Sequence, residues 1–205
     1  MGKIITQLSV SLDGFVAGPN DSQALPLGEG GEQLFAWYAS GDTDLALVGT
    51  DIVSRVSRTS AEFLRDVWTS LGAMVAGRRM FDIAGAWGGK PPSGSGPCFI
   101  VTHHPPQEWA GSGSPFVFVT AGVESAIRQA QAAAGEKIVS VDSASIMQQC
   151  IAAGLLDEVH LDLVPALLGG GVRLFDHLGA TPPALERLAV VAAPGVTHLR
   201  YRIVK

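Results

Sequence analysis

Residues 154–175 read GLLDEVHLDLVPALLGGGVRLF. Within this stretch, residues 158–164 alternate between polar and apolar side chains, a pattern that predicts a half-buried β-strand. Pro165 and the three glycines at 169–171 predict a loop directly after that strand. Because glycine lets the backbone approach a ligand closely, the loop at the end of this strand is a place to look for function.

Other strands are predicted on both sides of this stretch. Seven further runs of β-branched or alternating residues are short enough to be strands. They cover 4–10, 73–76, 98–101, 116–119, 138–141, 186–192 and 197–204. Pro194 and Gly195 separate the last two runs, so these two are expected to form an antiparallel hairpin.

Four segments between the strands predict helices. Residues 60–71 carry apolar side chains at helical spacing, with Thr59 or Ser60 able to cap the start and Gly72 able to end the helix. The other helical segments are 123–134, 145–153 and a shorter aromatic one at 32–40.

This order of elements predicts an α/β fold, in which helices flank a mostly parallel sheet of about eight strands and a C-terminal hairpin closes it. Clusters of proline and glycine interrupt the chain at intervals too short to isolate a second core. Residues 1–205 are therefore expected to form a single domain.

Composition excludes several classes of protein. Hydrophobic residues make up 47% of the chain and charged residues 16%, which excludes intrinsic disorder. The net charge of −5 disfavours nucleic acid as a partner. Cys98 and Cys150 lie in apolar stretches, as buried thiols do in a reducing compartment. No signal peptide and no uncharged run of about 18 apolar residues is visible, so we expect a cytoplasmic protein without a membrane partner.

Four loops follow strands of the predicted sheet and could carry chemistry. The first, SLDGFVAGPND at 11–21, combines glycines with apolar residues; the alternative is a surface turn formed by Asp13. The second, at 77–80, places two arginines where a helix begins, which suits an anion; the alternative is a solvated basic turn.

The third and fourth loops each contain hydroxyl groups, beside histidines in the third and beside a helix N-terminus in the fourth. Thr102, His103 and His104 place a hydroxyl beside two imidazoles, which could meet a phosphate or a ribose. Residues 141–145 join a strand to a helix N-terminus, where amides attract anions; the alternative is that Asp142 or Ser143 caps its own helix. The remaining histidines are scattered, so no metal site is expected.

Hydrolase, NTPase, zinc-protease and Rossmann motifs are all missing. Taken in order, SLDGFVAGPND, AGRRMFD, FIVTHHPP, AAGLLDEVHLDLVPALLGGGVRLF and THLRYRIV resemble the dihydrofolate reductase-like family that includes the reductase domain of bacterial riboflavin biosynthesis. The resemblance spans nearly the whole chain and is most specific at 154–175.

The resemblance implies an NADPH-dependent reductase of a small heterocycle, either pterin-like or a pyrimidine-like riboflavin precursor. It implies that Ala17 and Gly18 border the nicotinamide, and that residues 168–171 close over the cofactor. The cofactor would supply the hydride, and the protein would supply orientation and a dry pocket. The resemblance therefore implies no particular catalytic residue. The implied cofactor-binding residues are Ala17, Gly18, Gly77, Arg78, Arg79, Thr102, His103, Ser143, Ala144, Leu168, Gly169, Gly170 and Gly171. The implied substrate pocket is lined by Phe15, Phe35 and Trp37.

The chain departs from the family pattern at two places. Family members usually carry Gly-Gly where this chain has Asp142 and Ser143, and a carboxylate there would repel a diphosphate. The alternative function is therefore a non-catalytic or weakly cofactor-binding member of the fold, although Ser143 could donate its hydroxyl to a phosphate. Glu32 is a loosely aligned candidate for the carboxylate that anchors a pterin in dihydrofolate reductases.

The two C-terminal strands are long and apolar. Such a sheet edge, if exposed, invites pairing with a second copy of the chain, so we expect a homodimer.

Overall fold

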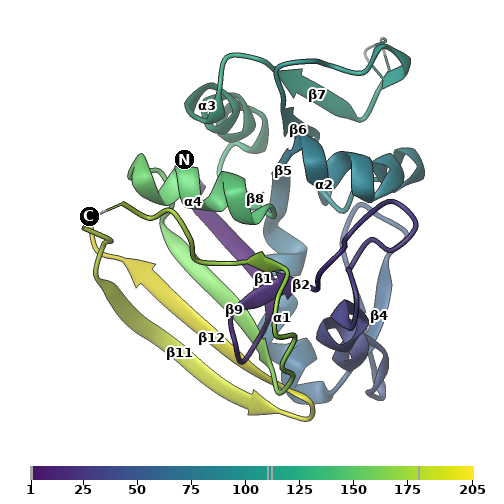
Figure 1. Cartoon of the computed structure of the whole chain (residues 1–205), viewed down its shortest axis with the longest axis vertical. Helices are drawn as coiled ribbons and strands as arrows, with labels where there is room; N and C mark the ends of the chain where they lie inside the picture. Colours follow the sequence, from purple (N-terminus) through teal and green to yellow (C-terminus); the bar gives the residue numbers. More distant parts are fainter. Residues whose placement is uncertain (1, 110, 112, 180) are drawn as a thin grey trace.

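The main sheet is built of eight strands. The computed structural model describes residues 2–109, 111, 113–179 and 181–205. The strands are β1 Ile4–Ser11, β5 Leu71–Gly77, β6 Cys98–Val101, β7 Phe116–Val119, β8 Ile138–Val141, β9 Glu158–Val164, β11 Leu185–Ala193 and β12 Val196–Ile203. Their order across the sheet is β11-β12-β9-β1-β8-β5-β6-β7 (Figure 1).

Within the run β9-β1-β8-β5-β6-β7, each pair of neighbouring strands is parallel. β12 runs antiparallel to β9, and β11 runs antiparallel to β12. The predicted α/β fold, with a mostly parallel sheet and a closing C-terminal hairpin, is confirmed.

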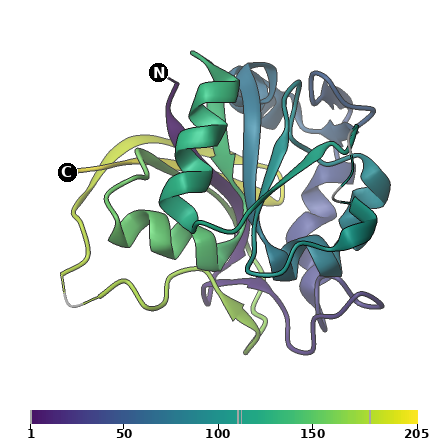
Figure 2. The ribbon, with the colours of Figure 1, turned by 90° about the horizontal axis from the view of Figure 1, so that it is seen from above.

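Helices cover both faces of this sheet (Figure 2). They are the 3-10 helix η1 Gly31–Ala39, α1 Arg58–Ser70, α2 Arg78–Ile83, the short η2 Gly85–Gly89 and η3 Gln107–Trp109, α3 Val123–Ala134 and α4 Ala144–Ala152. On one face, Ile127 of α3 and Met147 of α4 share a buried core with Val139 of the sheet. On the other face, η1 and α1 form a second core through Leu34 and Leu64.

Helix α1 differs from its prediction at both ends. Ser57 caps the helix, since its Oγ accepts a hydrogen bond from Ser60 N at 3.1 Å. At the other end, Leu71 is extended and begins β5, so the helix ends before Gly72. Gly72 is needed inside the strand instead, because a Cβ there would lie 2.5 Å from Cβ of Lys137.

Two small sheets were not predicted. The hairpin of β3 (Thr43–Ala46) and β4 (Val53–Val56) lies between η1 and α1 in the chain. The second small sheet pairs β2 (Phe15–Ala17) with β10 (Val172–Arg173), and so joins the loop after β1 to the loop after β9.

Three polar side chains in the interior, His198, Asp162 and Ser60, are hydrogen-bonded to one another. His198 Nδ1 lies 2.6 Å from Asp162 Oδ1, and His198 Nε2 lies 2.9 Å from Ser60 Oγ. The three residues are 0%, 2% and 1% exposed. Although this set of groups occurs in nucleophilic enzymes, burial keeps any substrate away from Ser60, and the network instead anchors α1 to the sheet.

Both cysteines are buried and free, as the sequence predicted. Burial raises the pKa of Cys98 above its usual range and that of Cys150 to about 12. Neither thiol is therefore reactive at neutral pH. Within the described residues, no helix combines the length and the apolar character needed to cross a bilayer.

Candidate functional site

The segments predicted to bind a cofactor lie along one edge of the sheet. Because β9, β1, β8, β5 and β6 are parallel, their carboxyl ends share this edge and follow one another in that order. The segments that follow these strands are 168–171, 11–18, 142–145, 77–79 and 102–103. They form a row long enough for an extended ligand to contact several loops at once.

A cavity of about 270 Å³ lies over the ends of β5 and β6; we call it the basic cavity. It is lined by residues predicted to contact the cofactor phosphates and adenosine, namely Gly77, Arg78, Arg79, Thr102 and His103. Among the described residues, no carboxylate lines it. The cavity therefore favours an anionic ligand.

Both guanidiniums at the basic cavity are held in place. Arg78 Nε donates to the two carboxylate oxygens of Asp82 at 2.7 and 2.9 Å, and Arg78 Nη1 donates to the carbonyl oxygen of His104. Arg79 Nη2 donates to Asp21 Oδ1 at 2.7 Å. An arginine has five N–H donors, so each side chain keeps donors for a phosphate after these bonds are made.

Ser143 joins the end of β8 to the end of β5. Its Oγ accepts a hydrogen bond from Gly77 N at 2.8 Å. Within the described residues, no side-chain hydrogen bond caps α4, so the alternative in which Asp142 or Ser143 caps its own helix is wrong. Ser145 and Ile146, in the first turn of α4 directly after the predicted Ala144, line the basic cavity. The positive end of this helix therefore faces the cavity.

Residues 168–173 form a closing segment over the other end of the row. Val172 pairs with Ala17, and Gly171 has a φ of +118°, where a Cβ would lie 2.1 Å from the carbonyl oxygen of Ala17 and 2.6 Å from the carbonyl carbon of Gly18. A Cβ on Gly170 would lie 3.4 Å from Cγ of Pro19. The residues predicted to border the nicotinamide are thus packed against those predicted to close over the cofactor.

Asp13 fastens the closing segment to the loop after β1. Its carboxylate accepts hydrogen bonds from Leu168 N at 3.1 and 3.2 Å and from Gly169 N at 2.7 Å. Ser11 Oγ donates to it at 2.6 Å. The Ser11 bond, together with the bonds from the two backbone amides, lowers the pKa of Asp13 to about 2. Asp13 is therefore ionised at neutral pH and does more than form a surface turn.

Replacing Asp13 by alanine is expected to loosen the closing segment. The amides of Leu168 and Gly169 lose their acceptor, so their hydrogen exchange should be accelerated several-fold. Hydrogen exchange followed by mass spectrometry measures this rate. The matched control is Asp42→Asn, because the Asp42 side chain accepts a hydrogen bond only from neighbouring Thr43 within the described residues. Unchanged exchange in the Asp13 variant would mean that other contacts hold the segment.

A second cavity, of about 350 Å³, lies between β1, β5, β8 and the helices η1 and α1; we call it the apolar cavity. Most of its wall is hydrophobic or aromatic, which suits a flat heterocycle. Its lining consists of Gln7, Leu8, Phe35, Tyr38, Leu47, Ile52, Ser54, Val67, Trp68, Leu71, Met74, Met80, Pro92, Ser140 and Asp142.

Among the described residues, Asp142 is the one carboxylate in this lining. Ser140 Oγ donates a hydrogen bond to its Oδ1. Burial raises the pKa of Asp142 to about 7, which places its titration near neutral pH. Burial, and then the charges of Asp162 and Asp142, also raise the pKa of Tyr38 well above its usual value. The Asp142 carboxyl lines the apolar cavity and is absent from the lining of the basic cavity.

The predicted substrate-pocket residues lie in three different places. Phe35 lines the apolar cavity. Trp37 is buried and donates from Nε1 to Ser9 Oγ at 3.2 Å, and Phe15 is buried under the guanidinium of Arg173. Neither Phe15 nor Trp37 lines the apolar cavity, and Glu32, the loosely aligned pterin anchor, is exposed and does not line it.

Sequence reasoning missed most of the aromatic and methionine side chains that line the apolar cavity. Tyr38 lies in a segment whose aromatics were expected near a pocket, but Trp68, Met74 and Met80 carried no signal that separated them from core residues. Among the described residues, no group of three or more histidine, cysteine, aspartate or glutamate side chains is placed to hold a metal ion.

Comparison with solved structures finds the same fold in several proteins. A protein assigned to riboflavin biosynthesis from Shewanella sp. PV-4 is 20% identical, with a TM-score of 0.70 over 100% of both chains. Dihydrofolate reductase from Enterococcus faecalis, complexed with NADP(H) and RAB-propyl, is 13% identical, with a TM-score of 0.59 over 100% of this chain and 98% of that one.

A pyrimidine reductase-like protein from Corynebacterium diphtheriae is 11% identical, with a TM-score of 0.55 over 100% of this chain and 92% of that one. No curated protein sequence matches the chain. The model of the RibD C-terminal domain matches residues 2–199. The chain belongs to the RibD C-terminal domain family.

Proposed function

We propose that this protein is an NADPH-dependent reductase of a small heterocycle, either a riboflavin precursor or a pterin-like compound. The observation that carries the proposal is the row of loops at the carboxyl ends of the strands, with the basic cavity at one end. This row suits a dinucleotide whose charged linkage needs several backbone amides and cations. The dihydrofolate reductase of similar fold, complexed with NADP(H), supports the same cofactor here.

The described residues fit this cofactor. Arg78 and Arg79 would hold phosphate groups, the first-turn amides of α4 would face the diphosphate, and Thr102 and His103 would contact the adenosine end. Ala17, Gly18 and the closing segment would border the nicotinamide. NADPH, when bound, supplies a hydride. The chain's own residues orient the two ligands and exclude water between them.

The apolar cavity is the proposed substrate site. Trp68, Met74 and Met80 supply flat or adaptable apolar contacts for a ring, and Ser140 and Asp142 add polar groups on one side. The similar proteins assigned to riboflavin biosynthesis and pyrimidine reduction support a nitrogen heterocycle as substrate.

Titration calorimetry of NADPH tests the cofactor site. We expect wild-type protein to bind NADPH, and Arg78→Met to weaken binding by about tenfold to a hundredfold, because charge-assisted hydrogen bonds to phosphate are lost. Arg55→Met is the control, since Arg55 pairs with Asp44 on the β3–β4 hairpin. Oxidation of NADPH in the presence of amino-pyrimidine and pterin compounds then tests turnover. Failure of the wild-type protein to bind NADPH would contradict the proposal.

A second candidate function is a member of the fold that binds cofactor weakly and lacks turnover. The feature that favours it is Asp142 at the end of β8, where the resemblance implies glycine, although its carboxyl lines the apolar cavity and not the basic one. Silence in both the titration and the oxidation assay would support this candidate.

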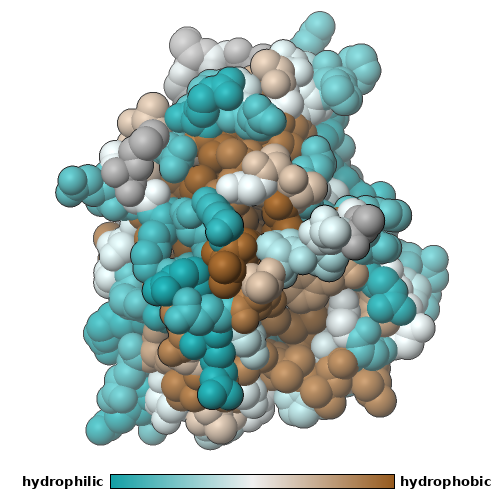
Figure 3. Space-filling model, turned by 90° about the vertical axis from the view of Figure 1, so that its left-hand side faces the viewer, coloured by the Kyte–Doolittle hydropathy of each residue, from teal (hydrophilic) through white to brown (hydrophobic). Residues whose placement is uncertain are grey.

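We also propose that the protein is a homodimer paired through β11. This strand lies at the sheet edge, and its Leu185, Leu188 and Val190 are 48%, 37% and 51% exposed. β12 lies inside the sheet, so only one of the two predicted strands is available for pairing. Figure 3 views the molecule from the side toward which β11 and α4 lie and shows hydrophobic areas among hydrophilic ones.

Replacing both Leu185 and Val190 by lysine is expected to separate the proposed dimer into monomers. Burying two ammonium groups in an interface should weaken association by at least about 30-fold. Sedimentation velocity of the wild type and the double variant measures the change. Val53→Lys is the control, since Val53 is 58% exposed on a different strand. A wild-type protein that sediments as a monomer would contradict the proposal.

We further propose that residues 1–205 act as one domain in the cytoplasm, on a small-molecule substrate and without nucleic-acid or membrane partners.

A further inference from the structure

The apolar cavity has an ionisable acid at one corner and no base to balance it. Among the described residues, no lysine, arginine or histidine side chain belongs to its lining, whereas Asp142 does. Val141 and Ser143, the chain neighbours of Asp142, are 0% and 7% exposed. Asp142 itself is partly exposed and does not line the basic cavity, so the surface that it exposes faces the apolar cavity. A ring bound in this cavity would meet its carboxyl group.

The hydrogen-bonding groups at this corner are acceptors. Ser140 has one hydroxyl hydrogen, and it donates this hydrogen to Asp142 Oδ1. Within the described residues, the other carboxylate oxygen, Oδ2, has no hydrogen-bond partner. When Asp142 is ionised, the two side chains therefore offer a ligand lone pairs but no hydrogen.

The groups that surround Asp142 do not change their charge near neutral pH. Tyr38 on η1 and Cys98 on β6 both feel the Asp142 charge, and burial raises the pKa of each above its usual range, so both stay neutral. Asp162 on β9, whose charge also reaches Tyr38, is held by His198 at 2.6 Å. Helix α2 reaches the cavity through Met80, which does not titrate. The charge at this corner therefore changes with Asp142 alone.

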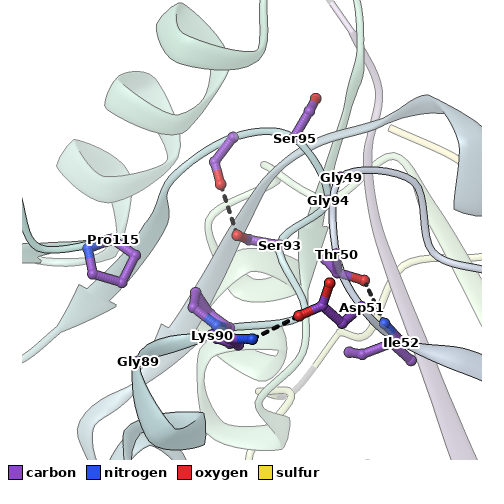
Figure 4. Close-up of a pocket in the computed structure, with 12 residues that line it drawn as sticks. Gly49, Thr50, Asp51, Ile52, Gly89, Lys90, Ser93, Gly94, Ser95 and Pro115 are labelled. Atoms are coloured by element: carbon purple, nitrogen blue, oxygen red, sulfur yellow. Dashed lines mark hydrogen bonds and ion pairs between the residues drawn. The ribbon is translucent and has the colours of Figure 1, made fainter.

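The ion pair on the other side of Ile52 does not compensate the Asp142 charge. Ile52 lines both the apolar cavity and a separate polar cavity, in which Lys90 Nζ lies 2.6 Å from Asp51 Oδ2 (Figure 4). The two side chains are 77% and 81% exposed, so water screens their charges. Burial is accordingly the main influence on the pKa of Asp142, and no cation lowers it. Compensation has to come from a ligand.

A heterocycle with two neighbouring N–H groups can supply this compensation. In a 2-amino-4-oxo pyrimidine ring, alone or fused to a second ring, the amino group lies beside a ring N–H, and both can donate to one carboxylate. In the corresponding 2,4-dioxo ring, a carbonyl oxygen replaces the amino group. That oxygen would face the lone pairs of the carboxylate, and both groups would lack a hydrogen-bond donor.

We propose that Asp142 determines ring specificity, because its carboxylate selects a heterocycle with an amino group next to a ring N–H over the corresponding dioxo ring. The inference rests on the proposed function, which places the ring in the apolar cavity. It narrows the substrate class to 2-amino heterocycles, and it gives a role in substrate binding to the residue that stands where the resemblance implies glycine.

Fluorescence titrations with two bicyclic compounds test this specificity. 2-Aminoquinazolin-4-one and quinazoline-2,4-dione have the same ring size and differ in the group on carbon 2. At about pH 8 most of Asp142 is ionised, and the amino compound should bind about tenfold or more tightly than the dione, as expected for hydrogen bonds to a charged group. At about pH 6 most of Asp142 is protonated and can donate to a carbonyl oxygen, so this ratio should fall several-fold.

The variant Asp142→Asn tests the carboxylate itself. Asparagine keeps an oxygen for the hydrogen bond from Ser140 and places an amide NH2 where Oδ2 stood, so it offers hydrogens in place of lone pairs. The preference for the amino compound should disappear or reverse at both pH values. Asp44→Asn is the matched control, since Asp44 pairs with Arg55 on the β3–β4 hairpin and does not line the cavity. It should keep the wild-type preference and its pH dependence.

The outcomes separate this specificity from the proposed function. Equal binding of the two compounds at pH 8, tighter binding of the dione by the wild type, or a preference that Asp142→Asn retains would overturn the role of Asp142 and leave the ring site standing. A pH dependence that is the same in the wild type and in Asp142→Asn would come from the compounds and would also overturn it. If neither compound binds, the ring site is wrong, and the specificity fails with it.

Discussion

Replacing Gly171 by alanine is expected to lower the free energy of unfolding by about 3 kcal/mol or more, because the new Cβ meets backbone and the backbone itself becomes strained. The φ of Gly171 is +118°, and the Cβ would lie 2.1 Å from the carbonyl oxygen of Ala17. Neither atom can move without breaking the pairing of Val172 with Ala17. NADPH binding should weaken as well, because the closing segment can no longer pack on Gly18. Urea unfolding and an NADPH titration measure the two effects.

Gly170→Ala is the matched control for this prediction. Among the atoms of the described residues, a Cβ there would have Pro19 Cγ alone within 4 Å, at 3.4 Å, and Gly170 is not in the left-handed region. We expect this variant to stay within about 1 kcal/mol of the wild type. If the two variants unfold at the same urea concentration, the close backbone packing at Gly171 does not determine stability.

Replacing Asp142 by asparagine is expected to stabilise the protein above neutral pH. The folded pKa of Asp142, about 7, lies above the ordinary aspartate value of 3.8 because burial penalises its charge. Between these values the folded state holds a proton that the unfolded state has lost, so stability falls as pH rises from about 4 to about 7, and the penalty is complete above that range. Each pKa unit corresponds to about 1.4 kcal/mol, which sets an upper bound of roughly 4 kcal/mol on the gain in the asparagine variant.

Urea unfolding at about pH 5, 7 and 9 tests this prediction, since the difference between variant and wild type should grow with pH and then level off. Asparagine keeps an oxygen that can accept the hydrogen bond from Ser140 Oγ, so that contact is preserved. Asp44→Asn provides the control on the exposed hairpin. If the difference in unfolding free energy between variant and wild type is the same at all three pH values, Asp142 does not titrate in this pH range.

The fold could be predicted from the sequence because the strands of its main sheet are apolar or alternating runs separated by glycine or proline. All eight predicted strands belong to the main sheet, and α3 has the predicted bounds. The β3–β4 hairpin was missed because its strands, TDLA and VSRV, are too short and too polar to show a period. Its pairing depends on a turn at Gly49 that packs on a segment distant in sequence, which no local pattern reveals.

The candidate site was only partly predictable. Strand order brings Gly77, Arg78 and Thr102 together, and sequence reasoning could place these residues because each directly follows a parallel strand. Sequence reasoning did not predict that the Asp142 carboxyl lines the apolar cavity. The necessary signal was present, since Ser140 and Asp142 are two residues apart and so share one face of the chain, opposite buried Val139 and Val141. Trp37 does not line the apolar cavity; its indole is buried and donates from Nε1 to Ser9 Oγ, because an aromatic residue on a short helix can face either a cavity or the core.

The peptide bond between Asp142 and Ser143 links the linings of the two proposed ligand sites. One of these residues lines the apolar cavity and the other holds Gly77 at the basic cavity. A ligand that displaces this peptide from either side must change affinity on the other side, and reciprocity requires the same factor in both directions. The order in which cofactor and substrate are added would then change the route to the ternary complex, but not the total free energy of forming it.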